Sequence, residues 1–187
     1  MENNFLDISY LKTGNLRQRK AYNVLVSSCI FSILSDYDPV LTGTIPIRID
    51  VEGSDLDIVC KMTDPGEFYR LMTTQFGNYP DFNIYYKNDD IIVCSFYIDE
   101  MIIEVFASPS ESTHTNAYRH MTIEYRILNL LGEGFKEKVI ELKRQGLKTE
   151  PAFAVLLDLE GNPYDELLKL KDWSDEKITN HFRPDPE

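Results

Sequence analysis

The sequence predicts an α+β protein, in which a mixed β-sheet with flanking helices is followed by an all-helical C-terminal half. Strand-like apolar runs stand between short polar turns up to residue 107, and beyond the polar stretch 108–116 apolar residues recur at helical spacing. With 187 residues, 43% of them hydrophobic, the chain is long enough for a core of this kind. We expect a sheet domain with an N-terminal helix over residues 1–110, and a helical subdomain packed on it over residues 111–187.

The first elements follow from caps and breakers. Asn15 can cap a helix over residues 16–37, which the Asp-Pro pair at 38–39 would end. A strand over 40–49, interrupted by a Gly-Thr turn and Pro46, leads to a second strand over 54–62. Asp64 with Pro65 opens a helix that Gly77 closes.

Three further strands and five helices complete the prediction. The strands cover residues 82–88, 91–98 and 101–107, joined by the short polar connections of hairpins. Helices are expected over 117–132, 133–146, 151–161, 163–173 and 175–182, with glycines as stop signals after the first three.

The net charge of −12 disfavours nucleic acid or an anionic membrane as a partner, since either requires a basic surface. We expect no signal peptide, because residues 1–15 have no basic stretch followed by an apolar run, and the sequence has no apolar run of about 20 residues. The three cysteines form no CxxC pair and stand in apolar surroundings, which favours buried free thiols. We expect a cytoplasmic protein.

Two aspartates stand in an otherwise apolar strand, in the stretch GSDLDIVC at residues 53–60. Successive strand side chains alternate, so Asp55 and Asp57 share one face. Two neighbouring carboxylates repel unless a divalent cation such as Mg²⁺ lies between them. The pair alone is better explained as two surface residues of a solvated strand.

The surrounding residues favour the metal. Gly43 and Thr44 form a small-residue turn about ten residues before Asp55, and Glu104 stands in the middle of the apolar strand MIIEVFA. A lone glutamate is costly to bury in such a strand unless it is paired or binds a ligand.

This combination resembles the minimal nucleotidyltransferase fold shared by DNA polymerase β and the kanamycin and lincosamide nucleotidyltransferases. Its pattern of a Gly-Ser turn, a Dh[DE]h strand and a later h[DE]h strand corresponds here to residues 41–44, 55–58 and 103–105. Over most of the chain, GTIPIRIDVEGSDLDIVC, NAYRHM and GLKTEPAFA also resemble a family of small bacterial proteins on this fold, distantly similar to the GrpB-type group.

The resemblance implies a transferase that moves a nucleoside monophosphate from a nucleoside triphosphate to an unknown hydroxyl acceptor. Asp55, Asp57 and Glu104 would be its catalytic residues and its ligands for Mg²⁺, with Mn²⁺ as a substitute. Thr44 replaces the usual serine, and Pro46, Asp50 and Glu52 stand between the turn and the acids, which puts the family's usual triphosphate grip in question.

Further residues are candidates for phosphate binding, each with a structural alternative. Gly43 and Thr44 form either an anion-binding turn or an ordinary one, and Ser54 belongs to the same set. Arg119 either contacts phosphate or pairs with a nearby acid such as Glu111 or Glu124. His120 and Lys61 are the remaining candidates, against packing within a helix for the histidine and a surface position for the lysine.

An alternative function remains open at this point. The Thr44 substitution and the lack of an evident Lys/Arg cluster for a triphosphate suit a non-catalytic nucleotide-binding or protein-interaction module that keeps the fold. An antitoxin-like protein is a variant of the transferase hypothesis. The sequence does not indicate the oligomeric state.

Overall fold

The computed structural model describes residues 4–182, and its internal contacts divide the chain into two compact units. Within the described residues, the first unit comprises residues 4–48 and 53–118, and the second comprises residues 49–52 and 119–182. A short segment of the N-terminal half, residues 49–52, therefore belongs to the unit formed by the C-terminal helices.

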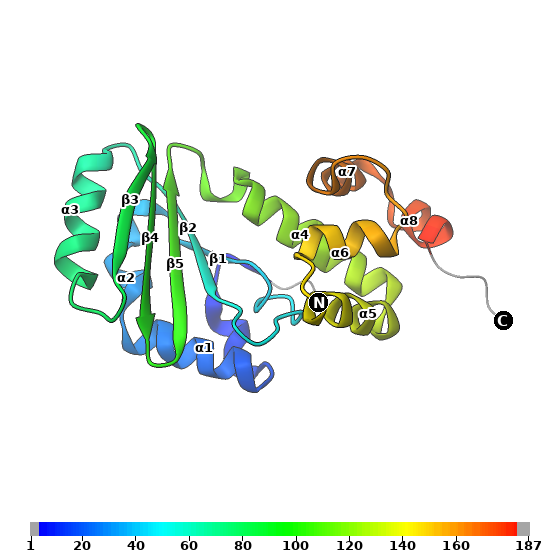
Figure 1. The fold of residues 1–187 in the computed structure, drawn as a ribbon, viewed down its shortest axis with the longest axis horizontal. Coiled ribbons are helices and arrows are strands. Elements are labelled where there is room, and N and C mark those ends of the chain that lie inside the picture. The colour runs from blue at the N-terminus through cyan, green and yellow to red at the C-terminus, as the bar shows by residue number, and fades with distance from the viewer. Residues whose placement is uncertain (1–3, 183–187) are drawn as a thin grey trace. The chain divides into compact units, whose positions relative to one another are not determined.

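A five-stranded mixed sheet forms the centre of the first unit, in the order β1-β2-β5-β4-β3 (Figure 1). β2 pairs in parallel with β5, and the other neighbours are antiparallel. The mixed α+β architecture is as predicted. The strands are β1 (Val40–Thr42), β2 (Leu56–Lys61), β3 (Asn83–Asn88), β4 (Ile91–Ile98) and β5 (Met101–Ser108).

One face of the sheet is packed against helices. Leu41, Ile58, Val105 and Cys94, which are neighbours across four strands, are all fully buried. They share a hydrophobic cluster with apolar side chains of the helices that precede β1 and of the helix between β2 and β3. The helical elements of this unit are η1 (Ile8–Thr13), α1 (Leu16–Ser27), α2 (Ile30–Ile33), η2 (Ser35–Tyr37), α3 (Pro65–Phe76) and η3 (Ser112–His114).

Two predicted helix starts are confirmed in atomic detail. Asn15 caps α1 with a capping box in which its side chain accepts from the Gln18 backbone N–H and the Gln18 side chain accepts from the Asn15 backbone N–H. Asp64 caps α3 by accepting from the Glu67 backbone N–H, with Pro65 in the first turn.

Other predictions in this region were wrong. The helix expected over 16–37 is broken at Cys29, whose φ of 55° lies in the left-handed region that ends a right-handed helix. Cys29 is also exposed, whereas Cys60 and Cys94 are buried as expected. The strand expected over 40–49 ends at Thr42, because Gly43 with φ +81° turns the chain away from β2.

The second unit is helical, and no strand occurs in the described part of it, as predicted. Each of its long helices contributes fully buried apolar side chains, such as Ile127, Val139 and Phe153. No helix within residues 4–182 is long and apolar enough to cross a membrane. Its elements are α4 (Asn116–Leu131, from Arg119 on), α5 (Glu133–Arg144), α6 (Thr149–Leu156), α7 (Pro163–Lys169), η4 (Leu170–Asp172) and α8 (Asp175–Phe182).

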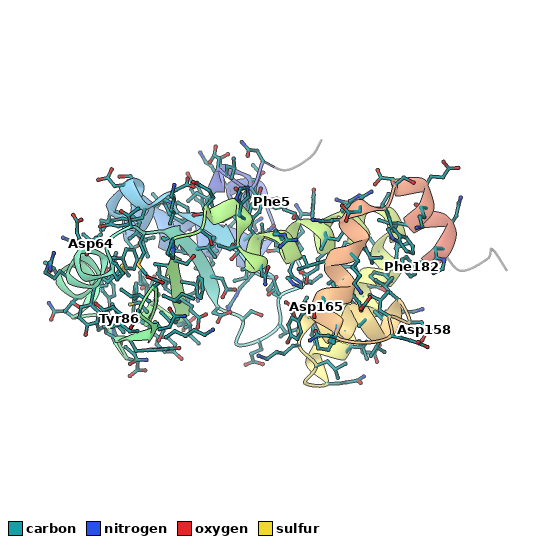
Figure 2. All side chains as sticks on the ribbon, turned by 90° about the horizontal axis from the view of Figure 1, so that it is seen from above. Phe5, Asp64, Tyr86, Asp158, Asp165 and Phe182 are labelled. Carbon is teal, nitrogen blue, oxygen red and sulfur yellow. The ribbon has the colours of Figure 1, made fainter. Side chains whose placement is uncertain are left out.

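The segment 49–52 is held in this unit by a long-range hydrogen bond. The ammonium group of Lys143 donates to the backbone carbonyl of Ile49 at 2.7 Å, and both residues are buried. A buried carbonyl without a partner is costly, so this contact stabilises the segment's place among the helices. In Figure 2, Asp158 and Asp165 mark the loop after α6 and the start of α7.

Candidate functional site

The face of the sheet opposite the helices of the first unit carries a row of polar side chains across all five strands. Thr42 pairs with Asp57, Asp57 with Glu104, Glu104 with Ser95, and Ser95 with Asn83. Paired residues on neighbouring strands project to the same face. Asp57 and Glu104, 47 positions apart in the sequence, are therefore direct neighbours on this face, and both are partly exposed.

The turn after β1 lies against the Asp57 carboxylate. A Cβ atom added to Gly43 would come within 2.1 Å of Asp57 Oδ2, and the glycine has φ +81°. Only glycine meets both conditions, because other residues lack the space and pay for the left-handed backbone in strain. The predicted small-residue turn is therefore in van der Waals contact with one of the predicted acids.

Ser54, Asp55 and Thr44 lie around the entry to β2. The Thr44 hydroxyl is 3.4 Å from the Ser54 hydroxyl, which brings together two predicted phosphate-binding residues. Asp55 immediately precedes β2 and is partly exposed, two positions before Asp57. Two hydroxyl groups thus lie close together, and Asp55 follows one of them directly in the sequence.

Two residues that fix this loop were missed by the sequence analysis. Arg17 of α1 donates to the Ser54 carbonyl at 2.9 Å, and Gln18 donates to the carbonyls of Ile45 and Pro46 at 3.1 and 3.0 Å. Gln18 is 1% exposed and also accepts from Arg48. Arg17 belongs to no motif, and the capping box explains Gln18 only as part of the helix start. Their hydrogen bonds to the loop depend on how the first turn of α1 lies in space.

Lys61, the last residue of β2, has an acidic side chain as its partner. Its ammonium group forms an ion pair with Glu111, and this hydrogen bond raises the pKa of Lys61 and lowers the pKa of Glu111. Both side chains are partly exposed, so the pair is readily rearranged. The predicted phosphate contact would require Lys61 to leave Glu111.

A hollow continues along the same sheet face. Phe106 lies two positions beyond Glu104 on β5 and lines a pocket of about 500 Å³. Ser108, on the same face, also contributes, and the remaining walls come from the β3–β4 turn and the loop that follows β5. The lining residues are Asn88, Asp90, Ile91, Phe106, Ser108, Pro109, Ser110, His114, Thr115 and Asn116.

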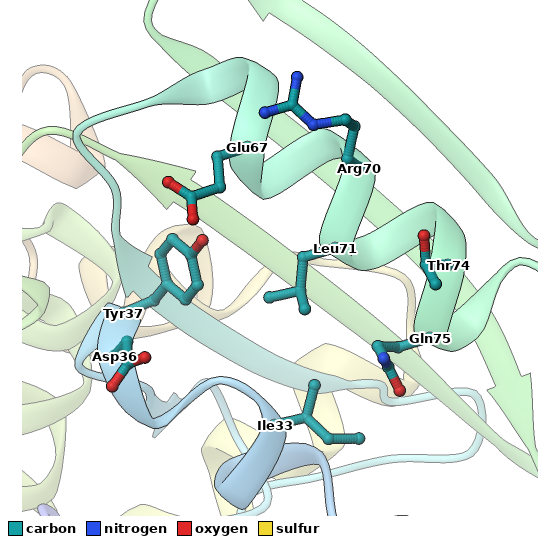
Figure 3. Close-up of a pocket in the computed structure, with 8 residues that line it drawn as sticks. All are labelled: Ile33, Asp36, Tyr37, Glu67, Arg70, Leu71, Thr74 and Gln75. Atoms are coloured by element: carbon teal, nitrogen blue, oxygen red, sulfur yellow. The ribbon is translucent and has the colours of Figure 1, made fainter.

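A second pocket lies on the helical side of the first unit. It measures about 430 Å³ and is formed by α2, η2 and α3, with Tyr37, Glu67 and Arg70 in its wall (Figure 3). These helices pack on the sheet face opposite Asp57 and Glu104. This pocket is therefore separate from the row of acids.

The other two predicted phosphate contacts, Arg119 and His120, belong to the second unit. Arg119 is partly exposed, whereas His120 is 5% exposed. His120 Nδ1 is 3.8 Å from a carboxylate oxygen of Glu150, and its ring packs edge-on against Tyr164. Its surroundings are those of a buried polar cluster, which weighs against the proposed contact with a solvent-borne phosphate.

Glu124 completes that cluster, four residues after His120 on α4, and it was missed as a site residue. It is 3% exposed, and burial, together with the nearby Glu150, raises the pKa of its carboxyl to about 8, while Lys143 acts in the opposite direction. Burial lowers the pKa of His120, and Glu150 opposes this effect. The i, i+4 spacing of His120 and Glu124 was the available sequence signal.

Comparisons with known proteins identify the family of the chain and its fold. The family described as "Domain of unknown function (DUF4269)" matches residues 23–170. The chain belongs to the DUF4269 family. A search of curated proteins found no match.

Among solved structures, a Cid1 RNA terminal uridylyl transferase is similar with a TM-score of 0.56 at 12% identity, over 75% of this chain and 48% of that one. The MgGTP-bound Cid1 poly(U) polymerase gives a TM-score of 0.54 at 12% identity over the same shares. The GLD-2/RNP-8 complex gives 0.53 at 10% identity, over 89% of this chain and 75% of that one.

These likenesses establish a nucleotidyltransferase fold for this DUF4269 protein, as the motif pattern predicted. Identities of 10–12% extend no further than the fold. The chain also spans only about half the length of the Cid1 chains.

Proposed function

We propose that this DUF4269 protein is a Mg²⁺-dependent nucleotidyltransferase that transfers a nucleoside monophosphate from a nucleoside triphosphate to a hydroxyl acceptor. The observation that carries the proposal is the pairing of Asp57 with Glu104 on a partly exposed sheet face, with the Gly43 turn in contact with Asp57. Carboxylates at this position in a nucleotidyltransferase fold are the side chains that metal-dependent nucleotidyl transfer requires.

The donor atoms suit the metal. Asp55, Asp57 and Glu104 offer carboxylate oxygens, the hard ligands that Mg²⁺ prefers, together with substrate phosphates. The partial exposure of all three residues leaves room for a phosphate beside them. Bound there, Mg²⁺ would stabilise the negative charge that develops on the phosphoryl oxygens.

The chain's own groups have separate tasks in this proposal. The backbone N–H groups of the Gly43 turn and the Thr44 and Ser54 hydroxyls donate to the triphosphate. Glu104 accepts the proton of the acceptor hydroxyl, whose oxygen forms the new bond to the α-phosphorus. The bond between the α-phosphorus and the α–β bridging oxygen breaks, and pyrophosphate leaves. Arg17 and Gln18 are positioning residues, since they hold the loop that carries these donors.

The pocket next to Glu104 suits the acceptor. Its walls combine Phe106, an apolar ring, with the polar groups of Ser108 and His114. The structural neighbours include a poly(U) polymerase, but the net charge of −12 gives an RNA acceptor little electrostatic help here. We therefore propose a small molecule or a protein hydroxyl as the acceptor.

Pyrophosphate release from each of the four nucleoside triphosphates, with Mg²⁺ or Mn²⁺, tests the proposal. We expect release with at least one triphosphate, together with labelling of an acceptor or of the protein itself. Asp57→Asn and Glu104→Gln should lower the rate at least a hundredfold, because each removes a charged ligand. Asp99→Asn, a change in the exposed β4–β5 turn, is the matched control and should retain the wild-type rate.

Two results would contradict the proposed transferase. Binding of a triphosphate by calorimetry without pyrophosphate release would select the non-catalytic nucleotide-binding alternative. Equal rates for Asp57→Asn and Asp99→Asn would show that Asp57 has no part in the mechanism.

A further inference from the structure

His120, Glu124 and Glu150 form a second cluster of ligand-type side chains, in the helical unit. Each offers one atom, and these three atoms lie within 4.8 Å of one another. Among residues 4–182 this is the group that meets such a criterion, and it shares no residue with the acids of the sheet. All three residues, on α4 and α6, belong to the second unit.

The secondary structure brings the three side chains together. His120 and Glu124 are four residues apart on α4, so they lie on one face of that helix. Glu150 is the second residue of α6 and faces them, with its Oε1 at 3.8 Å from His120 Nδ1. His120 belongs to the stretch NAYRHM and Glu150 to the stretch GLKTEPAFA, and both stretches carry the resemblance to the family of small bacterial proteins.

Two buried polar atoms point to a ligand. His120 Nδ1 and Glu124 Oε1 are sealed from solvent and have no hydrogen-bond partner, although their residues are 5% and 3% exposed. A buried polar atom without a partner costs roughly 1–3 kcal/mol, so such atoms are rare in folded proteins and frequently mark an ion or a water. Here two of them belong to the same cluster.

The ammonium group of Lys143 does not account for both atoms. Lys143 of α5 is close enough for its charge to lower the pKa of Glu124, yet Glu124 Oε1 still lacks a partner. The Lys143 ammonium group also donates to the Ile49 carbonyl. A divalent cation can bind both atoms at once, which the Lys143 ammonium group does not do here.

We propose that His120, Glu124 and Glu150 bind a first-row divalent transition metal ion, with Zn²⁺ as the test ion, which ties α4 to α6. One imidazole nitrogen with two carboxylates is a ligand set for such ions rather than for Mg²⁺, which prefers oxygen donors throughout. Three protein ligands leave a fourth position for water.

The distances between the three donor atoms fit a tetrahedral metal site after a small contraction of the cluster. Bonds of about 2.0–2.2 Å in a tetrahedral site place neighbouring donors about 3.4 Å apart. The 3.8 Å between His120 Nδ1 and Glu150 Oε1 is close to that value. Because all three atoms lie within 4.8 Å of one another, no pair has to close by more than about 1.4 Å. Glu150 can supply that movement, because its side chain is 21% exposed.

The test uses the full chain with the sheet site disabled, so that the two metal sites are not confused. Asp57→Asn protein, stripped with a chelator, is titrated with Zn²⁺ by calorimetry and then examined by X-ray absorption. We expect one Zn²⁺ per chain, with one imidazole nitrogen and carboxylate oxygens and no sulfur as ligands. Binding should also raise the melting temperature, because the ion binds only the folded state.

Substitutions at the cluster complete the test. Glu150→Gln in the same background should lower the Zn²⁺ affinity at least tenfold, and Glu124→Gln should do the same. Glu160→Gln, an exposed glutamate shortly after α6, is the matched control and should bind as the parent does.

Two results would overturn the proposal. The first is the absence of stoichiometric Zn²⁺ binding by the Asp57→Asn protein, or binding through sulfur. The second is an equal affinity for Glu150→Gln and Glu160→Gln. The X-ray absorption result needs no change in the cluster, so it decides the question even where a substitution prevents folding. The proposal does not depend on the proposed nucleotidyl transfer.

Discussion

Gly43 and Gly53 share a left-handed backbone but differ in their surroundings. Their φ values are +81° and +83°, yet only Gly43 lies against another group, the Asp57 carboxylate, whereas a Cβ at Gly53 would meet nothing within 4 Å. A Gly→Ala change at either position adds backbone strain of about 1–2 kcal/mol. At Gly43 it must also displace Asp57.

This difference predicts a separation of stability from ligand binding. Gly43→Ala and Gly53→Ala should lose similar free energy of unfolding, about 1–2 kcal/mol by denaturant titration. Gly43→Ala alone should weaken Mg²⁺–triphosphate binding, by tenfold or more in calorimetry, since its Cβ moves the Asp57 carboxylate. Equal affinities in the two variants would contradict a role of Asp57 in the metal site.

At the scale of residues, alternation along a strand predicts that Asp55 and Asp57 project to the same face, and this stays a prediction because Asp55 lies just before β2. The direct pairing of Asp57 with Glu104 depends on the parallel register of β2 and β5, which only the motif resemblance indicated. The grouping of His120 with Glu150 joins positions 30 residues apart across two helices, and no local pattern could show it.

The starts of helices with a strong local cap were predicted most accurately. Asn15 and Asp64 open α1 and α3 through hydrogen bonds within three residues, so the information is local. The loop after β1 was predicted as a strand. Its residues Ile45, Ile47 and Ile49 alternate along the sequence as in a strand, and the structure buries all three. Its backbone carbonyls instead accept from Gln18 and Lys143, which are distant in the sequence.

The break between α1 and α2 supports a stability prediction at the same scale. Cys29 has φ 55°, a strained value for a residue with a side chain, and it is exposed. Cys29→Gly should therefore raise the free energy of unfolding by up to about 1 kcal/mol, the relief of strain exceeding the added entropy of the unfolded chain. Chemical denaturation of the full chain measures it.

The neighbouring residue provides the control. Ser28 has φ −77° and ψ −12°, a right-handed conformation that glycine does not favour. Ser28→Gly should therefore lower the stability by roughly 0.5–1 kcal/mol. Two variants that shift in the same direction would show that strain at Cys29 does not limit the stability of this segment.

For the whole molecule, composition and periodicity predicted a sheet-bearing half and a helical half. They could not predict that residues 49–52 join the helical unit, because that depends on the contact between Lys143 and Ile49 over a separation of 94 residues. The net charge of −12 adds a general repulsion to which closely spaced acids contribute. Neutralising one acid of the proposed metal site on the sheet is therefore expected to change the free energy of unfolding as well as the affinity for the ligand.

Asp57→Asn makes that effect measurable by melting temperature. Without metal, the change removes repulsion between Asp55 and Asp57 while it keeps the side-chain shape, so the stability should stay level or rise slightly. With Mg²⁺ and a bound triphosphate the order should reverse, because wild type gains RT ln(1 + [L]/Kd), about 2.7 kcal/mol at a hundredfold excess, and the variant gains little. If wild type gains nothing with any of the four triphosphates, the nucleotidyltransferase proposal fails. A large loss in Asp57→Asn without metal would instead make Asp57 a structural residue, whose hydrogen bonds hold the turn at Gly43 against β2.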